Sequence, residues 1–330
     1  MNSSVAAQII EAMDAQTAAF RADVIAGLSE ADKLLPSRWL YDDRGSDLFE
    51  QITKLPEYYP TRTETGILTS NAQSLAAFCG QQAVIIEYGA GASIKSQILL
   101  NALRQPRMYV PVDIAGDFLA AAAERLRKRF PALEVLPVAA DFTQEFDLPN
   151  AVPAEFKRTG FFPGSTIGNL APEEAISFLS RVHRHVTDRQ SADPQPGRTL
   201  IGIDLKKSTD VLIPAYDDAA GVTAAFNLNL LRRINRELGG TFKLDQFQHE
   251  ARWNDAASSI EMHIVSSTDQ TVVAAGKAFD FAEGETIHTE SSRKYSQEGF
   301  AAIAADAGWR VTQTWTDSDD LFAIVGLETL

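Results

Sequence analysis

The stretch that decides the fold is AVIIEYGAGAS, residues 83–93. A short run of apolar, largely β-branched residues ends here in a glycine-rich turn, which is typical of a buried parallel strand that leads into a helix. Helical patterns alternate with further short apolar strands, which we expect at residues 108–115, 133–142 and 198–207, and with a strand and loop at 158–170. This alternation predicts an α/β fold with a doubly wound parallel sheet.

The chain leaves this sheet after residue 207 and returns to it near its end. A long amphipathic helix is expected up to Gly239, where paired glycines stop it. Strands are expected to follow at residues 258–267, 271–281 and 285–295. A helix at 296–307 and two closing strands then rejoin the sheet. We therefore predict two domains, one made of residues 63–207 plus 295–330 and the other of residues 1–62 plus 208–294.

Composition excludes several classes of protein. The 330 residues carry 30 Lys and Arg against 44 Asp and Glu, a formal net charge of −14, which argues against binding to nucleic acid or to anionic membranes. No apolar stretch is long enough to span a bilayer. Cys79 is the only cysteine, so no intrachain disulfide can form, and we expect a cytoplasmic protein that requires no protein partner.

No metal site is expected from the histidines. His183 and His185 would point about 200° apart on one helix, so they do not share a metal, and we expect both to be exposed to solvent. The other three histidines show no recognised ligand spacing.

Polar residues follow the first three predicted strands, where ligands of open α/β sheets bind. Gly89 and Gly91 follow the first strand and allow a ligand to approach the backbone. Asp113 ends the second strand and suits the hydroxyls of a ribose, and Asp141-Phe142 ends the third and suits an adenine. The alternative is a plain turn at the glycines and a helix N-cap at Asp113.

Our prediction of the nucleotide ligand depends on a glycine that the dinucleotide-binding motif requires and this sequence lacks. The dinucleotide pattern GxGxxG fails because its third glycine position is Ile94. An NAD-dependent oxidoreductase is therefore disfavoured, and an adenosine without pyrophosphate is favoured, which points to S-adenosylmethionine.

Seven segments, in this order, resemble one known family. They are YDDRGSDLFEQITKLPEYYPTRTE, EYGAGAS, PVDIAG, ADF, FFPGSTIGNL, AYDDAAGVTAAFN and TESSRKY. From about residue 36 to the C-terminus, the chain resembles the S-adenosylmethionine-dependent histidine Nα-methyltransferases of ergothioneine biosynthesis. The resemblance implies a Rossmann-like class I methyltransferase sheet and a second, α+β substrate-binding domain built from the N-terminal segment and an insertion. It also implies transfer of three methyl groups to the α-amino group of L-histidine, giving hercynine.

The resemblance also assigns residues to both ligands. For S-adenosylmethionine it implies Gly89, Lys95, Asp113, Asp141 and Phe142. For histidine it implies Tyr58, Asn169 and Tyr216 at the carboxylate and amino group, Glu290 and Ser292 at the imidazole nitrogens, and Met262 beside the ring. Tyr41 is implied near the imidazole or the amine, where it or a water molecule would relay the proton that the amine loses.

The assigned residue types suit an imidazole. A neutral imidazole has one donor and one acceptor nitrogen, which a hydroxyl and a carboxylate together can match. Judged without the resemblance, Glu290 could be a solvated strand residue and Met262 a core residue. Two other functions remain open: N-methylation of another amino acid such as tryptophan, and a non-catalytic module that binds S-adenosylmethionine or an amino acid.

Overall fold

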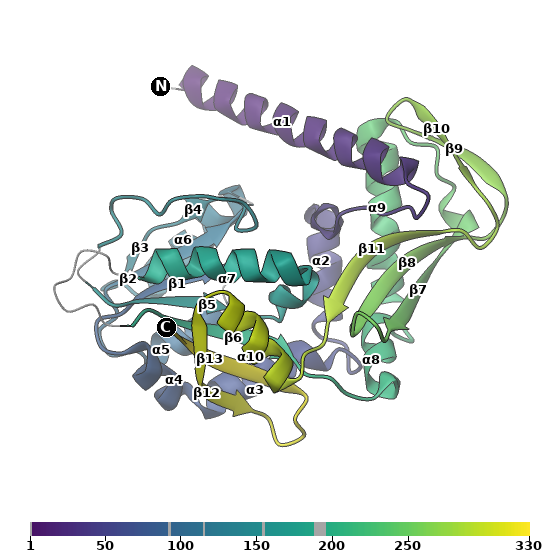
Figure 1. The fold of residues 1–330 in the computed structure, drawn as a ribbon. Helices are drawn as coiled ribbons and strands as arrows, with labels where there is room; N and C mark the ends of the chain where they lie inside the picture. Colours follow the sequence, from purple (N-terminus) through teal and green to yellow (C-terminus); the bar gives the residue numbers. More distant parts are fainter. Residues whose placement is uncertain (1, 92–93, 115, 154–155, 188–195) are drawn as a thin grey trace. The chain divides into compact units, whose positions relative to one another are not determined.

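The structure, a computed structural model, describes residues 2–91, 94–114, 116–153, 156–187 and 196–330 (Figure 1). The last two residues of the stretch quoted above, 92–93, lie outside the described residues. The chain divides into two compact units. The insertion unit comprises Met1–Tyr59 and Ser208–Ser292, and the sheet unit comprises Pro60–Lys207 and Arg293–Leu330. The predicted domain boundaries at 62, 207 and 294 differ from 59, 207 and 292 by 3, 0 and 2 residues.

In the sheet unit, eight strands of the described chain form one sheet, in the order β12-β13-β6-β5-β1-β2-β3 with β4 also beside β2. Their bounds are β1 Val84–Tyr88, β2 Met108–Asp113, β3 Glu134–Val135, β4 Val138–Ala139, β5 Arg158–Phe162, β6 Arg198–Asp204, β12 Trp309–Thr316 and β13 Phe322–Thr329. Strands β1 to β6 pair in parallel, whereas β13 runs antiparallel to both β6 and β12. The predicted parallel sheet is confirmed.

Helices cover both faces of this sheet. They are α3 Tyr59–Ser70, α4 Ala72–Cys79, α5 Ile94–Ala102, α6 Gly116–Arg129, α7 Pro172–Val186 and α10 Gln297–Asp306, with the short 3-10 helix η2 Thr166–Asn169. Apolar side chains of α7 and α10 pack in one core with alternate strand residues such as Ile86, while those of α3, α4, α5 and α6 pack in a second core with Ile85. Neighbouring residues of β1 thus enter opposite cores, and the doubly wound arrangement is confirmed.

The insertion unit combines helices with two small sheets (Figure 1). Its elements are α1 Asn2–Ser29, η1 Ser37–Leu40, α2 Asp43–Ile52, α8 Thr209–Tyr216, α9 Val222–Leu238, η3 Leu244–Gln246, β7 Phe247–Asn254, β8 Ser259–Ser266, β9 Gln270–Ala274, β10 Lys277–Phe281 and β11 Thr286–Arg293. Strands β11, β8 and β7 form one sheet in that order, and β9 pairs with β10. Helix α9 ends at Gly239, whose φ of 63° only glycine adopts readily. Among the described helices, none is both long and apolar enough to cross a bilayer.

Three expectations about local structure were wrong. The single strand expected at 271–281 is the β9–β10 hairpin, because Ala275 and Gly276 turn the chain with φ of 54° and 82°. The strand expected at 133–142 is split into β3 and β4 around Pro137, which lacks the N–H that a ladder needs. His185 is buried, not solvated, because its ring hydrogen-bonds to the Tyr88 hydroxyl at 3.0 Å.

Candidate active site

The glycine loop after β1 holds the predicted ribose carboxylate. Gly89 and Gly91 adopt positive φ angles of 66° and 46°, which glycine alone reaches without strain. The Gly89 amide donates to the Val112 carbonyl at 2.9 Å, and the Gly91 amide donates to Asp113 Oδ2 at 3.0 Å. The loop is therefore tied directly to the end of β2, and Asp113 lies where the sequence predicted it.

The predicted adenine residues lie against the same loop. A Cβ at Gly89 would be 3.4 Å from the Phe142 ring, so the missing side chain leaves room for this ring. Asp141 Oδ1 accepts the Thr143 amide at 2.9 Å and the Thr143 hydroxyl at 2.6 Å, which fixes the turn after β4. Because β4 pairs with β2, the structure brings Gly89, Asp113, Asp141 and Phe142 to one edge of the sheet.

Arg181 supports this edge and was missed from the sequence. Its guanidinium donates to the carbonyls of Phe142 and Thr143 at 2.8 and 3.2 Å, and only 5% of its side chain is exposed. The Phe142 ring also packs on Phe162 and Phe178, with centroids 5.4 and 5.8 Å away. An arginine among the apolar residues of α7 was the available signal, since a buried guanidinium requires acceptors.

Lys95 and Asn169 complete the predicted residues of the sheet unit. Lys95 lies in the first turn of α5 and forms an ion pair with Glu64 of α3. Asn169 is half-buried at the end of η2. The loop that carries it is held by Ser165, whose hydroxyl accepts the Asp204 amide at 2.9 Å.

In the insertion unit, predicted tyrosines gather with a carboxylate and a hydroxyl. The Tyr216 hydroxyl donates to Ser292 Oγ at 2.8 Å, and the Tyr58 and Tyr216 rings lie 6.1 Å apart. The Glu290 carboxylate lies close enough to the Tyr41 phenol to raise its pKa. The structure thus brings together five residues that are far apart in sequence, which we call the phenol cluster: Tyr41, Tyr58, Tyr216, Glu290 and Ser292.

Tyr41 has a perturbed acidity. The pKa of its phenol is raised well above the usual value of 10.0, through burial, through the Glu290 carboxylate, and through Tyr58 and Tyr216. The residue keeps 40% of its surface exposed, so the neighbouring Glu290 carboxylate contributes to the shift beside burial. Tyr41 is therefore a neutral phenol at pH 7, able to donate a hydrogen bond but not to act alone as a base.

Strand β11 presents the two polar groups assigned to the imidazole. Glu290 and Ser292 are two positions apart, so their side chains lie on one face of the strand, where they are 8% and 5% exposed. Met262, 2% exposed, lies in the neighbouring strand β8, and its carbonyl accepts the Thr289 hydroxyl at 3.0 Å. Backbone pairing thus places all three in one small sheet.

Two phenylalanines of this cluster were also missed. The Tyr41 ring centroid lies 5.5 Å from Phe49 and 5.4 Å from Phe226 in edge-on contacts, and Phe49 contacts Tyr58 at 6.2 Å. Both belong to sequence segments that carry the family resemblance, which was the signal that could have found them.

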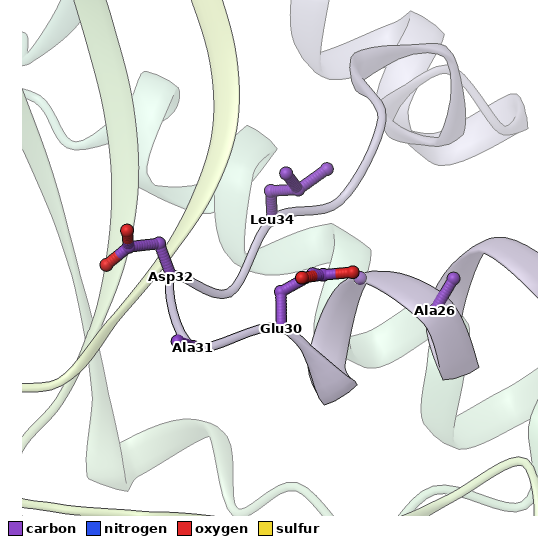
Figure 2. A pocket seen from close by; sticks show the side chains of 6 residues that line it. Ala26, Glu30, Ala31, Asp32 and Leu34 are labelled. Carbon is purple, nitrogen blue, oxygen red and sulfur yellow. The ribbon is translucent and has the colours of Figure 1, made fainter.

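Two surface hollows of the insertion unit lie away from these residues. One, of about 430 Å³, is lined by the end of α1 and the turn after it: Ala26, Gly27, Glu30, Ala31, Asp32 and Leu34 (Figure 2). The other, of about 480 Å³, includes His263 and His288. Neither contains a predicted site residue, and within the described ranges no three ligand-type side chains gather as a metal site.

Comparison with known proteins gives a consistent set of relatives. The family described as "Histidine-specific methyltransferase, SAM-dependent" matches residues 20–329. Histidine N-alpha-methyltransferase of Mycolicibacterium smegmatis is 44% identical, covering 93% of this chain and 94% of that one. The protein of the same name from Mycobacterium tuberculosis is 39% identical, covering 94% and 95%. Ergothioneine biosynthesis protein 1 of Neurospora crassa is 29% identical, covering 87% of this chain and 32% of that one.

Proposed function

Because this chain belongs to the family of S-adenosylmethionine-dependent, histidine-specific methyltransferases, we propose that it methylates the α-amino group of L-histidine. Three successive transfers give hercynine, the trimethylated betaine. Each transfer forms a bond between the amine nitrogen and the methyl carbon, breaks the bond from that carbon to sulfur, and releases S-adenosylhomocysteine.

The observation that carries the choice of histidine is the pairing of Glu290 with Ser292 on β11. Both are largely buried, and together they offer an anionic acceptor and a hydroxyl that donates or accepts. A neutral imidazole satisfies both groups at once, through its N–H and its unprotonated nitrogen. An indole has an N–H donor but no acceptor nitrogen, so it can pair with the carboxylate but offers no acceptor to the hydroxyl, which favours imidazole.

The edge of the sheet unit supports binding of the methyl donor. The Asp113 carboxylate suits the ribose hydroxyls, and the Phe142 ring beside Gly89 suits a face of the adenine. Lys95 supplies a cation for the methionine carboxylate of the donor. Asn169 belongs to the same unit, and its proposed contact with histidine rests on the resemblance alone.

The amine must be neutral before it attacks, since a protonated amine has no lone pair. Transfer also requires nitrogen, methyl carbon and sulfur on one axis at roughly 3 Å spacing. We assign the proton relay to Tyr41, whose phenol lies beside the Glu290 carboxylate. The phenol oxygen accepts the amine proton while its own proton passes toward the carboxylate, so no free tyrosinate has to form.

Mass spectrometry of the products tests this proposal. Purified protein with S-adenosylmethionine and L-histidine should give histidine carrying one, two and three added methyl groups, and fragmentation should place all of them on the α-nitrogen. Methyl groups found on the imidazole would contradict the assignment of Glu290 and Ser292. Binding of both ligands without any product would favour a non-catalytic module.

We further propose that hercynine made by this protein enters ergothioneine biosynthesis in the cytoplasm. The relative from Neurospora crassa supports the first point, and a single cysteine suits a reducing compartment. Deleting the gene should remove hercynine and ergothioneine together from cell extracts, and cell fractionation should place the protein in the soluble cytoplasmic fraction.

A further inference from the structure

A carboxylate with no exposed surface lies beside the loop that follows β5. Glu64 of α3 is 0% exposed, and both of its carboxylate oxygens accept the Gly164 amide, at 2.8 and 2.9 Å. The same carboxylate forms an ion pair with Lys95. No function described above uses Glu64, yet a buried charge is costly unless it is paired and hydrogen-bonded.

Two glycines make room for this ion pair. A Cβ on Gly202 of β6 would lie 2.3 Å from Glu64 Oε1, far inside contact distance. A Cβ on Gly164 would lie 3.4 Å from Lys95 Nζ, and Gly164 also has a φ of 87°. Neither position tolerates a larger residue without displacing the carboxylate, the lysine or the loop. Space for the Glu64 carboxylate is therefore left both by strand β6 and by the loop after β5.

Lys95 differs from Glu64 in one important respect. Its side chain keeps 21% of its surface exposed, so the ammonium is anchored on one side and accessible on another. An ammonium has three donors, and lysine carries it on a flexible stem with high rotamer entropy. A fixed buried carboxylate removes much of that freedom before any ligand binds, which lowers the entropic cost of binding an anion.

We propose that Glu64 is a positioning residue for the methyl donor, which holds Lys95 ready for the methionine carboxylate. Through the Gly164 amide it also fixes the start of the loop that ends in Asn169. This inference rests on the proposed function only in its use of S-adenosylmethionine. It adds that affinity for the amino-acid end of the donor depends on a carboxylate that the donor does not touch.

Calorimetry with two ligands separates this role from a structural one. S-adenosylhomocysteine carries the amino-acid end, whereas methylthioadenosine lacks it and retains ribose and adenine. Glu64→Gln keeps an acceptor for Gly164 but removes the charge that holds Lys95, so Kd for S-adenosylhomocysteine should rise about tenfold because the lysine is no longer ordered before the ligand binds. Kd for methylthioadenosine should stay unchanged. An unchanged Kd for S-adenosylhomocysteine, or an equal rise for both ligands, overturns the inference.

Two further variants complete the test. Glu124→Gln removes a carboxylate from an exposed ion pair with Arg127 in the same unit, and it should change neither affinity. Lys95→Met should reproduce the selective loss even if the Glu64 variant does not fold, and an unchanged affinity for S-adenosylhomocysteine there also overturns the inference. Failure of the unaltered protein to bind S-adenosylhomocysteine would instead contradict the proposed function.

Discussion

The two units build their candidate sites in different ways. In the sheet unit the site consists of backbone turns and strand ends within residues 89–142, braced by buried charges such as Glu64 and Arg181. In the insertion unit it consists of phenols, a hydroxyl and one carboxylate drawn from positions as distant as Tyr41 and Ser292. The first site follows from the topology of a parallel sheet, and the second follows from how separate segments pack.

This difference separates two kinds of specificity. The edge of a sheet offers the same places for ribose and adenine in many proteins, so it identifies the kind of cofactor. The phenol cluster depends on individual side chains, so we propose that it selects the amino acid that is methylated. Changes in the sheet unit should therefore act on the cofactor, and changes in the insertion unit on histidine and on turnover.

The largest effect is expected at Asp113. Asp113→Ala removes the proposed ribose acceptors and the brace on the Gly91 amide. Two charge-assisted hydrogen bonds at about 2 kcal/mol each correspond to a rise in Kd for S-adenosylmethionine of roughly a thousandfold. Calorimetry measures this directly. Asp113→Asn, which keeps one acceptor, should lose less, and an unchanged affinity in both variants would remove the ribose role.

A smaller effect is expected at Tyr41, on rate and not on binding. Tyr41→Phe keeps the ring contacts with Phe49 and Phe226 but removes the hydroxyl that meets Glu290. Loss of a positioned proton relay should lower kcat about a hundredfold while Kd for S-adenosylmethionine stays the same. Phe49→Leu is the matched control for packing. A kcat equal to that of the unaltered protein would assign the proton transfer to water.

A variant of Glu290 tests whether the insertion unit binds histidine. Glu290→Ala should raise KM for histidine about thirtyfold, because an anionic partner of the imidazole is worth about 2 kcal/mol. KM for S-adenosylmethionine should change little. Comparable changes in both constants would show that Glu290 supports the fold and not histidine alone.

The smallest effect concerns stability and pH at Glu87 of β1. Burial raises the pKa of this carboxyl to about 7, against hydrogen bonds from Ser96 and Tyr109 that lower it. The folded protein therefore retains a proton that the unfolded chain has lost above its ordinary pKa of 4.5, so stability falls as pH rises from 4.5 through 7. Thermal melts should show a smaller fall for Glu87→Gln. Parallel curves for the two proteins would contradict the shift.

The sheet could be predicted because its signals are local. The apolar run before Gly89 forms β1. Asp113 ends β2, and Asp141 follows β4, and these positions depend on the strand pattern and not on side-chain packing. The sequence did not predict the turn between β9 and β10, which lies within an apolar run. Ala275, a residue other than glycine, adopts a positive φ there.

The phenol cluster could not be derived from spacing. Tyr41, Tyr216 and Glu290 are far apart in the sequence, and without the family resemblance Glu290 was better explained as a solvated strand residue. Two buried polar residues that support others carried signals that did not show their contacts: Arg181 lies among apolar residues of α7, and Glu64 ends a segment that carries the family resemblance. They became visible only through the backbone amides and carbonyls that they contact.

Specific methylation of L-histidine is tested by a methylation assay with S-adenosylmethionine across the standard amino acids. Each amino acid is present at the same concentration, and the products are read by mass spectrometry. We expect only L-histidine to give mono-, di- and trimethylated products. Equal or faster methylation of tryptophan, or no methylated histidine at saturating substrate, would contradict it.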